Sequence, residues 1–290
     1  MHTPDGFLTS WVCVLTFMIS LSFVACSIYA LRKTINKQKI ILMAFLSAAI
    51  FMLQMLNFPI SNATSGHFLG AGIAAILLGP SAAIVIITVV LIVQSLVYGD
   101  GGILTIGANV LNMGIVAAYA TFYIYKQSDK LSTVAFSTWF GIVAASIFSA
   151  LELWASNAGS FWDLIYAMGK THMIIGICEA VITIGLFIIW KRLSSLSVKK
   201  TLNYSAFYFC ICVVVLAFFL PFASNNPDGL ESVALNLGFY GKETIIYPYA
   251  LMQDYLADSG YIFALISGLI GAIMCYALCA ASAMLIRKPS

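Results

Sequence analysis

Charged residues are scarce in this chain: only 9% of its 290 residues are Asp, Glu, Lys or Arg, whereas 62% are hydrophobic. A soluble domain carries about 25% charged residues, so little of the chain can form a separate soluble domain. Histidine is scarcer still, with only His2, His67 and His172. The apolar runs also lack clusters of His, Asp and Glu, which argues against a membrane-embedded enzyme.

Signals of several other protein classes are missing too. The apolar runs do not alternate with polar residues, as the strands of an outer-membrane barrel would. All seven cysteines lie in apolar runs, where they indicate helix packing and no soft-metal site. Gly169-Lys170-Thr171 resembles the end of a phosphate-binding loop, but Leu164 replaces the required earlier glycine. We expect no bound nucleotide, no nucleic-acid partner and no cofactor, so any ATP-driven step needs a partner protein.

Long apolar runs are abundant. About 20 residues span a hydrocarbon core as a helix, and helices satisfy their own backbone hydrogen bonds there. The sequence therefore predicts an all-α polytopic membrane protein. Its third helix is too short to span alone, so neighbours must shelter it or it is partly re-entrant. The predicted helices are 8–31, 40–57, 67–79, 81–98, 104–125, 133–156, 171–190, 204–222 and 261–286.

The basic residues predict an orientation. With the N-terminus outside and the C-terminus in the cytoplasm, 12 of the 14 Lys and Arg residues fall on the inner side. Only Lys170 and Lys242 fall outside, and all three histidines lie near the outer ends of helices. The twelve inner residues are Arg32, Lys33, Lys37, Lys39, Lys126, Lys130, Lys191, Arg192, Lys199, Lys200, Arg287 and Lys288.

Met1-His2 at the start of the chain can chelate a metal. No Lys or Arg precedes the first apolar run, so no signal peptide is expected, and the bulky His2 should keep Met1 in place. The α-amine, the His2 backbone nitrogen and its ring nitrogen can close two fused rings around one divalent ion. Square-planar nitrogen coordination favours Ni(II) or Cu(II) over zinc. His67 could fill the fourth position or could simply cap its helix, and the residues alone leave both open.

Other polar residues lie near the same outer face. Asp100, in the turn Tyr98–Gly102, could orient an imidazole, although turn chemistry alone also explains it. His172 and Glu179 share a helix face, and Glu152 lies near the outer end of its helix. Ionisable residues within spans are functional candidates. We expect Ser65, Asp100 and His172 to surround the metal ligands without binding directly.

The segment 223–260 is a polar loop between the last two predicted helices. A loop of this length is unusual without a role, and its acidic residues could attract cations or simply be solvated. With its flanking helices it resembles a module of residues 201–290 added to a seven-helix core of residues 1–200. The acidic residues are Asp228, Glu231, Glu243, Asp254 and Asp258.

These motifs together resemble the CbiM/NikM family, the substrate-binding S components of energy-coupling factor transporters for cobalt and nickel. Met1–Leu8 reads MHTPDGFL and is similar to the MHIPDGFL start of that family, with Thr3 in place of isoleucine. Pro227–Glu231 resembles the PDGLE module that is fused to such proteins. The other matching motifs are Thr64–His67, Gly79-Pro80, Val93-Gln94, Gly99–Gly102, Gly107–Asn109, Asn112-Met113, His172 and Ile175–Ala180.

The resemblance implies a function and a ligand set. The metal would be held by the Met1 amine, the backbone nitrogen and ring of His2, and the ring of His67. The substrate would be Ni²⁺, with Co²⁺ also possible, at the cell membrane of a prokaryote. Implied partners are a CbiQ/NikQ-like transmembrane T subunit and CbiO/NikO-like ATPase subunits, besides membrane lipid. The alternative is an ion-coupled secondary transporter that uses Glu179 and Glu152 as proton carriers.

Overall fold

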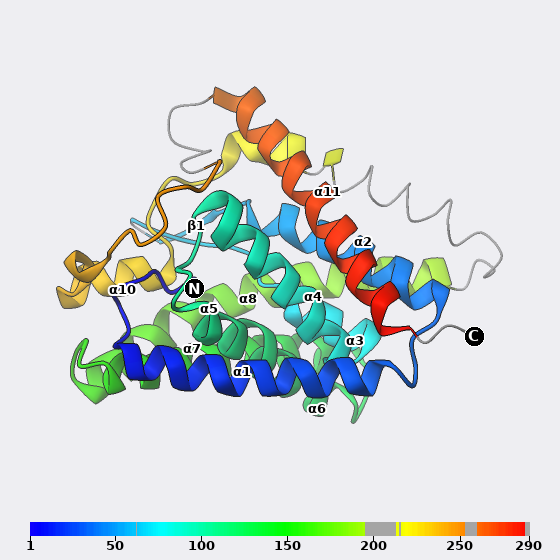
Figure 1. The fold of residues 1–290 in the computed structure, drawn as a ribbon, viewed down its shortest axis with the longest axis horizontal. Coiled ribbons are helices and arrows are strands. Elements are labelled where there is room, and N and C mark those ends of the chain that lie inside the picture. Colours follow the sequence, from blue (N-terminus) through cyan, green and yellow to red (C-terminus); the bar gives the residue numbers. More distant parts are fainter. Residues whose placement is uncertain (62, 195–212, 215, 253–259, 288–290) are drawn as a thin grey trace.

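The computed structural model describes the chain except for residues 62, 195–212, 215, 253–259 and 288–290. Within the described residues the structure is mostly helical (Figure 1). The only strands there, β1 (Phe58–Ser61) and β2 (Thr64–Gly66), form one antiparallel hairpin. Among the described residues, seven helices are long and apolar enough to cross a membrane. The chain is therefore an all-α polytopic membrane protein, as predicted.

Most of the predicted spans recur as observed helices. Two of them are composite, because α4 continues through a π-helical segment to Tyr98, and α5 continues through another into α6. The helices are α1 (Ser10–Leu31), α2 (Lys37–Gln54), α4 (Pro80–Val93), α5 (Ile106–Asn109), α6 (Ala117–Tyr125), α7 (Leu131–Ala155), α8 (Phe161–Ser194) and α11 (Gly260–Ile286).

The short third helix, α3 (Ala71–Leu78), is sheltered by its neighbours. Six of its eight residues are buried, and it packs against α4 and α6. It begins later than the predicted residue 67, because Gly70 adopts a φ of 80° that a continuing right-handed helix does not allow. Pro80 opens α4 immediately afterwards, a position where its missing N–H is harmless.

Helix α8 begins at Phe161, ten residues before the predicted start at 171. Leu164, Met168 and His172 are all buried, whereas Trp162 is exposed. Their spacing of four residues forms one buried helix face, which a search for continuous apolar runs overlooks. His172 therefore lies well inside α8, and the prediction that it starts a helix was wrong.

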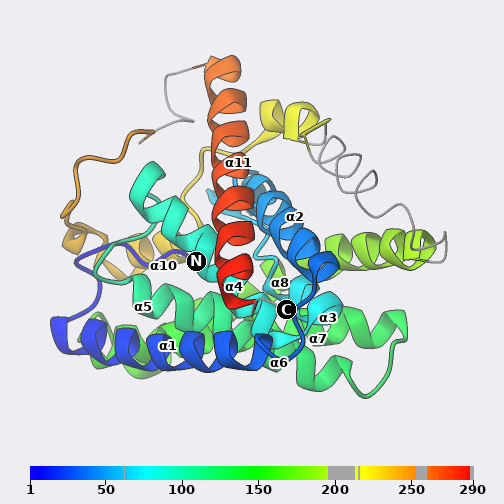
Figure 2. The same cartoon turned by 45° about the vertical axis from the view of Figure 1, so that its right-hand side comes forward.

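The C-terminal segment is only partly described. Of the predicted helix 204–222, residues 204–212 and 215 lie outside the described residues, as do Asp254, Asp258, Lys199, Lys200 and Lys288. The predicted loop contains a helix of its own, α10 (Gly229–Leu237), which packs against α8 and β2. Figure 2 shows α11 crossing over α2, and these two helices are in extensive contact.

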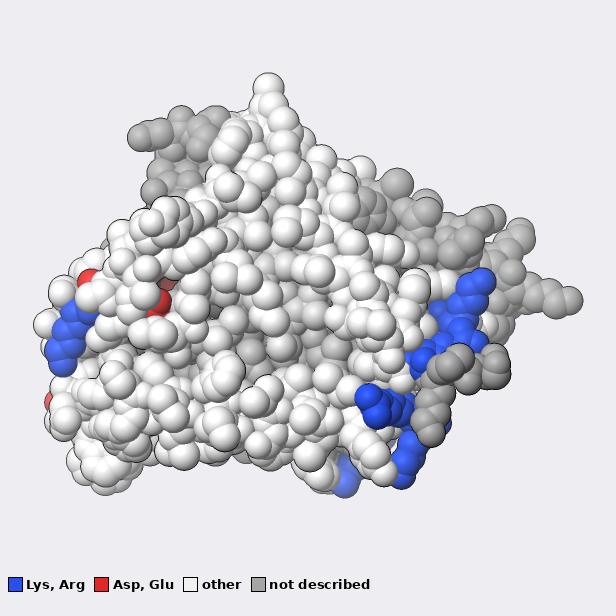
Figure 3. All heavy atoms as spheres, in the orientation of Figure 1, with Lys and Arg blue, Asp and Glu red and all other residues white. Residues whose placement is uncertain are grey.

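The molecular surface suits a membrane. Large apolar side chains are exposed along α1, including Val14, Phe17 and Leu21. Figure 3 shows one face of the molecule, with most of its visible Lys and Arg residues at the end opposite the visible acidic residues. Which of these two ends faces the outside of the cell stays a prediction.

Candidate metal site

The first residues of the chain fold back into the protein. Thr3 is held at both backbone groups: its N–H donates to Asn109 Oδ1 at 2.8 Å, and its carbonyl accepts from Asn109 Nδ2 at 3.2 Å. The N–H of Gly102 also donates to the Thr3 carbonyl, at 3.0 Å. Met1 and His2 are consequently buried, with 4% and 7% of their surfaces exposed.

Asp5 anchors this arm to the turn before α5. Its carboxylate accepts from three consecutive backbone N–H groups, those of Ile103 at 3.1 Å, Leu104 at 2.9 Å and Thr105 at 3.2 Å. The turn approaches closely because Gly102 has no side chain, and a Cβ there would overlap Asp5. The glycine-rich turn predicted from the sequence thus serves as the docking surface of the N-terminal arm.

A chain of side-chain amides favours one position for the proton on the His2 ring. Gln54 Nε2 donates to the Leu69 carbonyl at 2.7 Å, and Gln94 Nε2 donates to Gln54 Oε1 at 2.8 Å. Gln94 therefore offers its oxygen to His2 Nε2, 3.2 Å away, which favours a proton on that nitrogen. In that tautomer His2 Nδ1 keeps its lone pair, and this is the nitrogen that can join a chelate with the backbone.

His67 lies directly after β2 and presents its other nitrogen. Its Nδ1 donates to the Phe68 carbonyl at 3.1 Å, so Nε2 carries the lone pair. That Nε2 lies 3.1 Å from the Met1 amine. The rings of His2 and His67 stack, with centroids 4.9 Å apart. The structure thus brings together Met1, His2 and His67, the three residues predicted as ligands.

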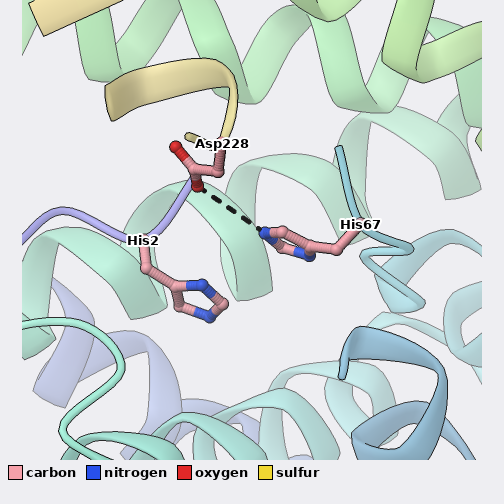
Figure 4. Close-up of side chains that lie close together, drawn as sticks. All are labelled: His2, His67 and Asp228. Carbon is pink, nitrogen blue, oxygen red and sulfur yellow. Dashed lines mark ion pairs between the residues drawn. The ribbon is translucent and has the colours of Figure 1, made fainter. Parts of the chain in front are cut away.

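Asp228 joins this group from the C-terminal segment (Figure 4). Its Oδ2 forms an ion pair with the Met1 amine and lies 4.0 Å from His67 Nε2. Donor atoms of His2, His67 and Asp228 all lie within 4.8 Å of one another. The sequence prediction placed Asp228 in a polar loop but gave it no place at the site.

The electrostatics of the site favour metal binding. Burial, and next the positive Met1 amine, lower the pKa of His2 to about 3. The same causes, with the neighbouring His2 ring, lower the pKa of His67 to about 3. Burial acts to raise the pKa of Asp228, but the amine and His67 outweigh it and hold that pKa well below its usual range. Near pH 7 the site therefore offers two neutral imidazoles and one carboxylate, all forms that bind metal.

The three residues predicted to surround the ligands have different roles. Ser65 donates its backbone N–H to the Pro227 carbonyl at 2.9 Å, which holds the segment that carries Asp228. Asp100 Oδ1 lies 3.2 Å from His2 Nδ1 and can accept a hydrogen bond from that nitrogen when it carries a proton. His172 is fully buried and lines a small cavity together with Met1 and His67. All three lie close to the predicted ligands.

The two carboxylates that the sequence predicted to lie within spans, Glu179 and Glu152, are engaged elsewhere. Glu179 accepts from the backbone N–H groups of Leu69 at 2.7 Å and Gly70 at 2.9 Å, and so shapes the turn between His67 and α3. Glu152 accepts from Asn112 Nδ2 at 2.7 Å. Glu179, which lies in α8, thus supports the loop that carries His67.

Sequence reasoning missed four residues that build the site: Asp5, Gln54, Gln94 and Asp228. Gln54 and Gln94 are single amides in apolar helices, a pattern that indicates hydrogen bonding across helices but not its target. Asp228 and Glu231 show the spacing of a capping box, which could have predicted the start of α10.

Comparison with known proteins places the chain in a family. The model of the family described as "Cobalt uptake substrate-specific transmembrane region" matches residues 2–196, two thirds of the sequence. The chain belongs to this cobalt-uptake family. A PDGLE domain matches residues 203–288. The resemblance stated from the motifs is therefore confirmed.

Relatives of this member of the cobalt-uptake family are named as metal transport proteins, not enzymes. It is 34% identical to a candidate fused nickel transport protein, NikMN, of Archaeoglobus fulgidus, with 96% of each chain covered. It is 33% identical to the fused nickel transport protein NikMN of Rhodobacter capsulatus, over 67% of this chain and 62% of that one. A crystal structure of a transition metal transporter shares 31% identity and a TM-score of 0.62, covering 67% of this chain and 94% of that one.

Proposed function

We propose that this protein is the substrate-binding S component of an ATP-driven energy-coupling factor transporter that takes up Ni²⁺, with Co²⁺ as a second substrate. The ion would be held in a square plane by four nitrogens: the Met1 amine, the backbone and Nδ1 nitrogens of His2, and His67 Nε2. It would bind at the outer face of a prokaryotic cell membrane, with the C-terminus in the cytoplasm.

The position of His67 next to the Met1 amine carries this proposal. In the chelate, the amine, the His2 amide and His2 Nδ1 occupy three successive corners of a square. The free corner lies opposite the amide and beside the amine. His67 Nε2 lies 3.1 Å from the amine with its lone pair available, which suits that corner.

The metal preference rests on two further observations. Four nitrogens in a plane suit Ni(II), whereas zinc prefers a tetrahedron. The relatives from A. fulgidus and R. capsulatus are both named as fused nickel transport proteins. Cobalt remains a substrate in the proposal, since other relatives are named cobalt transport proteins.

The proposed energy source is a partner, because the sequence carries no phosphate-binding motif. A transmembrane T subunit and two ATPase subunits would reorient the protein and release the ion inside. The competing proton-coupled scheme would need Glu179 or Glu152 to exchange protons. Glu179 instead accepts two backbone hydrogen bonds, which supports a structural role.

The decisive experiment moves the amine without changing any side chain. Adding two glycines before Met1 shifts the amine away from both His67 and His2, and we expect Ni²⁺ affinity in isothermal titration of the purified protein to fall at least about 100-fold. Two glycines added after Ser290 are the matched control, and this variant should bind normally. Unchanged affinity in the N-terminally extended protein would refute the proposed ligand set.

A further inference from the structure

The Asp228 carboxylate divides its two oxygens between two tasks. Oδ1 accepts from the N–H groups of Leu230 at 2.8 Å and Glu231 at 2.9 Å, which caps the start of α10. Glu231 returns a hydrogen bond from its carboxylate to the Asp228 N–H, completing a capping box. Oδ2 takes no part in the cap and points to the Met1 amine. One oxygen is therefore fixed and the other is available to a cation.

Several contacts hold α10 in place beside the site. The Pro227 carbonyl accepts from the Ser65 N–H, and Thr64 Oγ1 bonds Ser232 Oγ at 2.7 Å. Gly229 lies so close to α8 that a Cβ there would sit 3.1 Å from His172 Nε2. These contacts join α10 to the hairpin that carries His67, so Asp228 and His67 keep a fixed separation.

Asp228 also lines an acidic cavity, which we name the acidic access cavity. This cavity of about 190 Å³ is lined by His2 and His67 together with four carboxylates, and the described residues that line it include no Lys or Arg. Carboxylates gathered in a cleft raise the local concentration of cations. The four are Asp100, Asp228, Glu231 and Glu243.

We infer that Asp228 is the loading ligand of this transporter: a divalent cation that enters the acidic access cavity first binds Asp228 Oδ2 with the imidazoles of His67 and His2. The inference rests on the proposed function and adds a step before the four-nitrogen plane. As the cation takes over Oδ2, the Met1 amine loses its ion-pair partner, gives its proton to water and coordinates the metal in turn. The cation thus replaces the ammonium charge beside Asp228.

This order has a geometric reason. Donor atoms of His2, His67 and Asp228 already lie within 4.8 Å of one another, and all three residues line the access cavity. The Met1 amine is held in its ion pair with Asp228 Oδ2 until the cation takes that oxygen. The first complex can therefore form quickly, and the planar complex follows it. Asp228 then controls how fast metal binds and has little effect on how slowly it leaves.

The test measures association and dissociation rates of Ni²⁺ by stopped flow on the full-length protein in detergent. Asp228→Asn preserves the helix cap, because Asn is as good an N-cap as Asp, but it removes the anionic oxygen. We expect the association rate to fall about tenfold or more, with a dissociation rate within about threefold of wild type. Asp163→Asn removes an equal charge from the exposed start of α8, and should bind as wild type.

A second variant separates the first complex from the planar chelate. His2→Gln, which is bulky enough to keep Met1 in place, prevents the planar chelate and removes one imidazole of the first complex but leaves Asp228, His67 and the amine. Weak Co²⁺ binding should therefore persist in His2→Gln and should disappear in His2→Gln combined with Asp228→Asn. An unchanged association rate in Asp228→Asn, or an effect confined to dissociation, would overturn the inference. Those results would leave the proposed ligand set intact, since the glycine extension before Met1 tests it separately.

Discussion

Asp5 should control metal affinity without touching the metal. Its carboxylate receives the N–H groups of residues 103, 104 and 105 and fixes the arm two residues after Thr3. In Asp5→Asn, the side-chain oxygen can still accept from Leu104 and Thr105. The new NH₂ group, however, faces the Ile103 N–H, so one charge-assisted hydrogen bond is replaced by two opposed donors.

The structure sets the size of this effect. A hydrogen bond to a charged group contributes roughly 1.5–3 kcal/mol, so the anchored arm should lose about 2 kcal/mol relative to a released one. A released arm must dock again before it can bind metal. The apparent affinity therefore falls in proportion to the fraction of molecules whose arm is docked. A loss of about 2 kcal/mol corresponds to a rise in Kd of up to about thirtyfold.

Isothermal titration of Ni²⁺ into Asp5→Asn measures this directly, with Asp163→Asn as the control for a lost negative charge. Thermal unfolding of the same samples separates local release of the arm from global destabilisation. If Kd stays within about twofold of wild type, Asp5 does not anchor the binding conformation and the reasoning fails. An equal rise in Asp163→Asn would assign the effect to overall charge.

Three further substitutions test the supports of the ligands. His67→Ala removes the proposed fourth nitrogen, and Ni²⁺ affinity by calorimetry should fall at least about 100-fold; near-normal binding would exclude His67. Gln94→Ala frees His2 to protonate either ring nitrogen, and Kd should rise about tenfold, with the altered tautomer visible by NMR of the His2 ring. Glu179→Gln replaces an acceptor of two backbone N–H groups, so both the midpoint of thermal unfolding and Ni²⁺ affinity should decrease, whereas an unchanged midpoint would contradict its structural role.

The long helices could be predicted from the sequence because a single property, continuous apolarity, decides them. The start of α8 could not, because Asp163, Gly169 and Lys170 interrupt the apolar run there, although Leu164 and Met168 are buried. The β1–β2 hairpin was missed for a different reason. It is short, and its place depends on contacts such as Ser65 with Pro227, which join distant parts of the chain.

In the candidate site, too, some features depend on neighbouring residues and could be predicted, whereas others depend on residues far apart in the sequence. The chelating capacity of Met1-His2 depends only on neighbouring atoms, so covalent chemistry suffices to predict it. The capping box of Asp228 and Glu231 is equally local. The meeting of Asp228 with the Met1 amine joins residues 227 positions apart, and nothing in the spacing of the residues encodes it.

The N-terminal arm is held by contacts that use none of the proposed donor atoms. Thr3 and Asp5 bond to the turn around residues 102–105, and Phe7 packs edge-to-face on Phe239, with ring centroids 5.2 Å apart. Fixing the backbone of a flexible segment costs about 1–2 kcal/mol per residue, a loss that would otherwise weaken metal binding. Because these contacts order the arm without using the donor atoms, metal coordination does not have to offset this loss. The free energy of coordination then contributes to affinity and to discrimination between ions. The C-terminal segment contributes to this order through Phe239 as well as through Asp228, which gives a physical reason for the two parts to be carried on one chain.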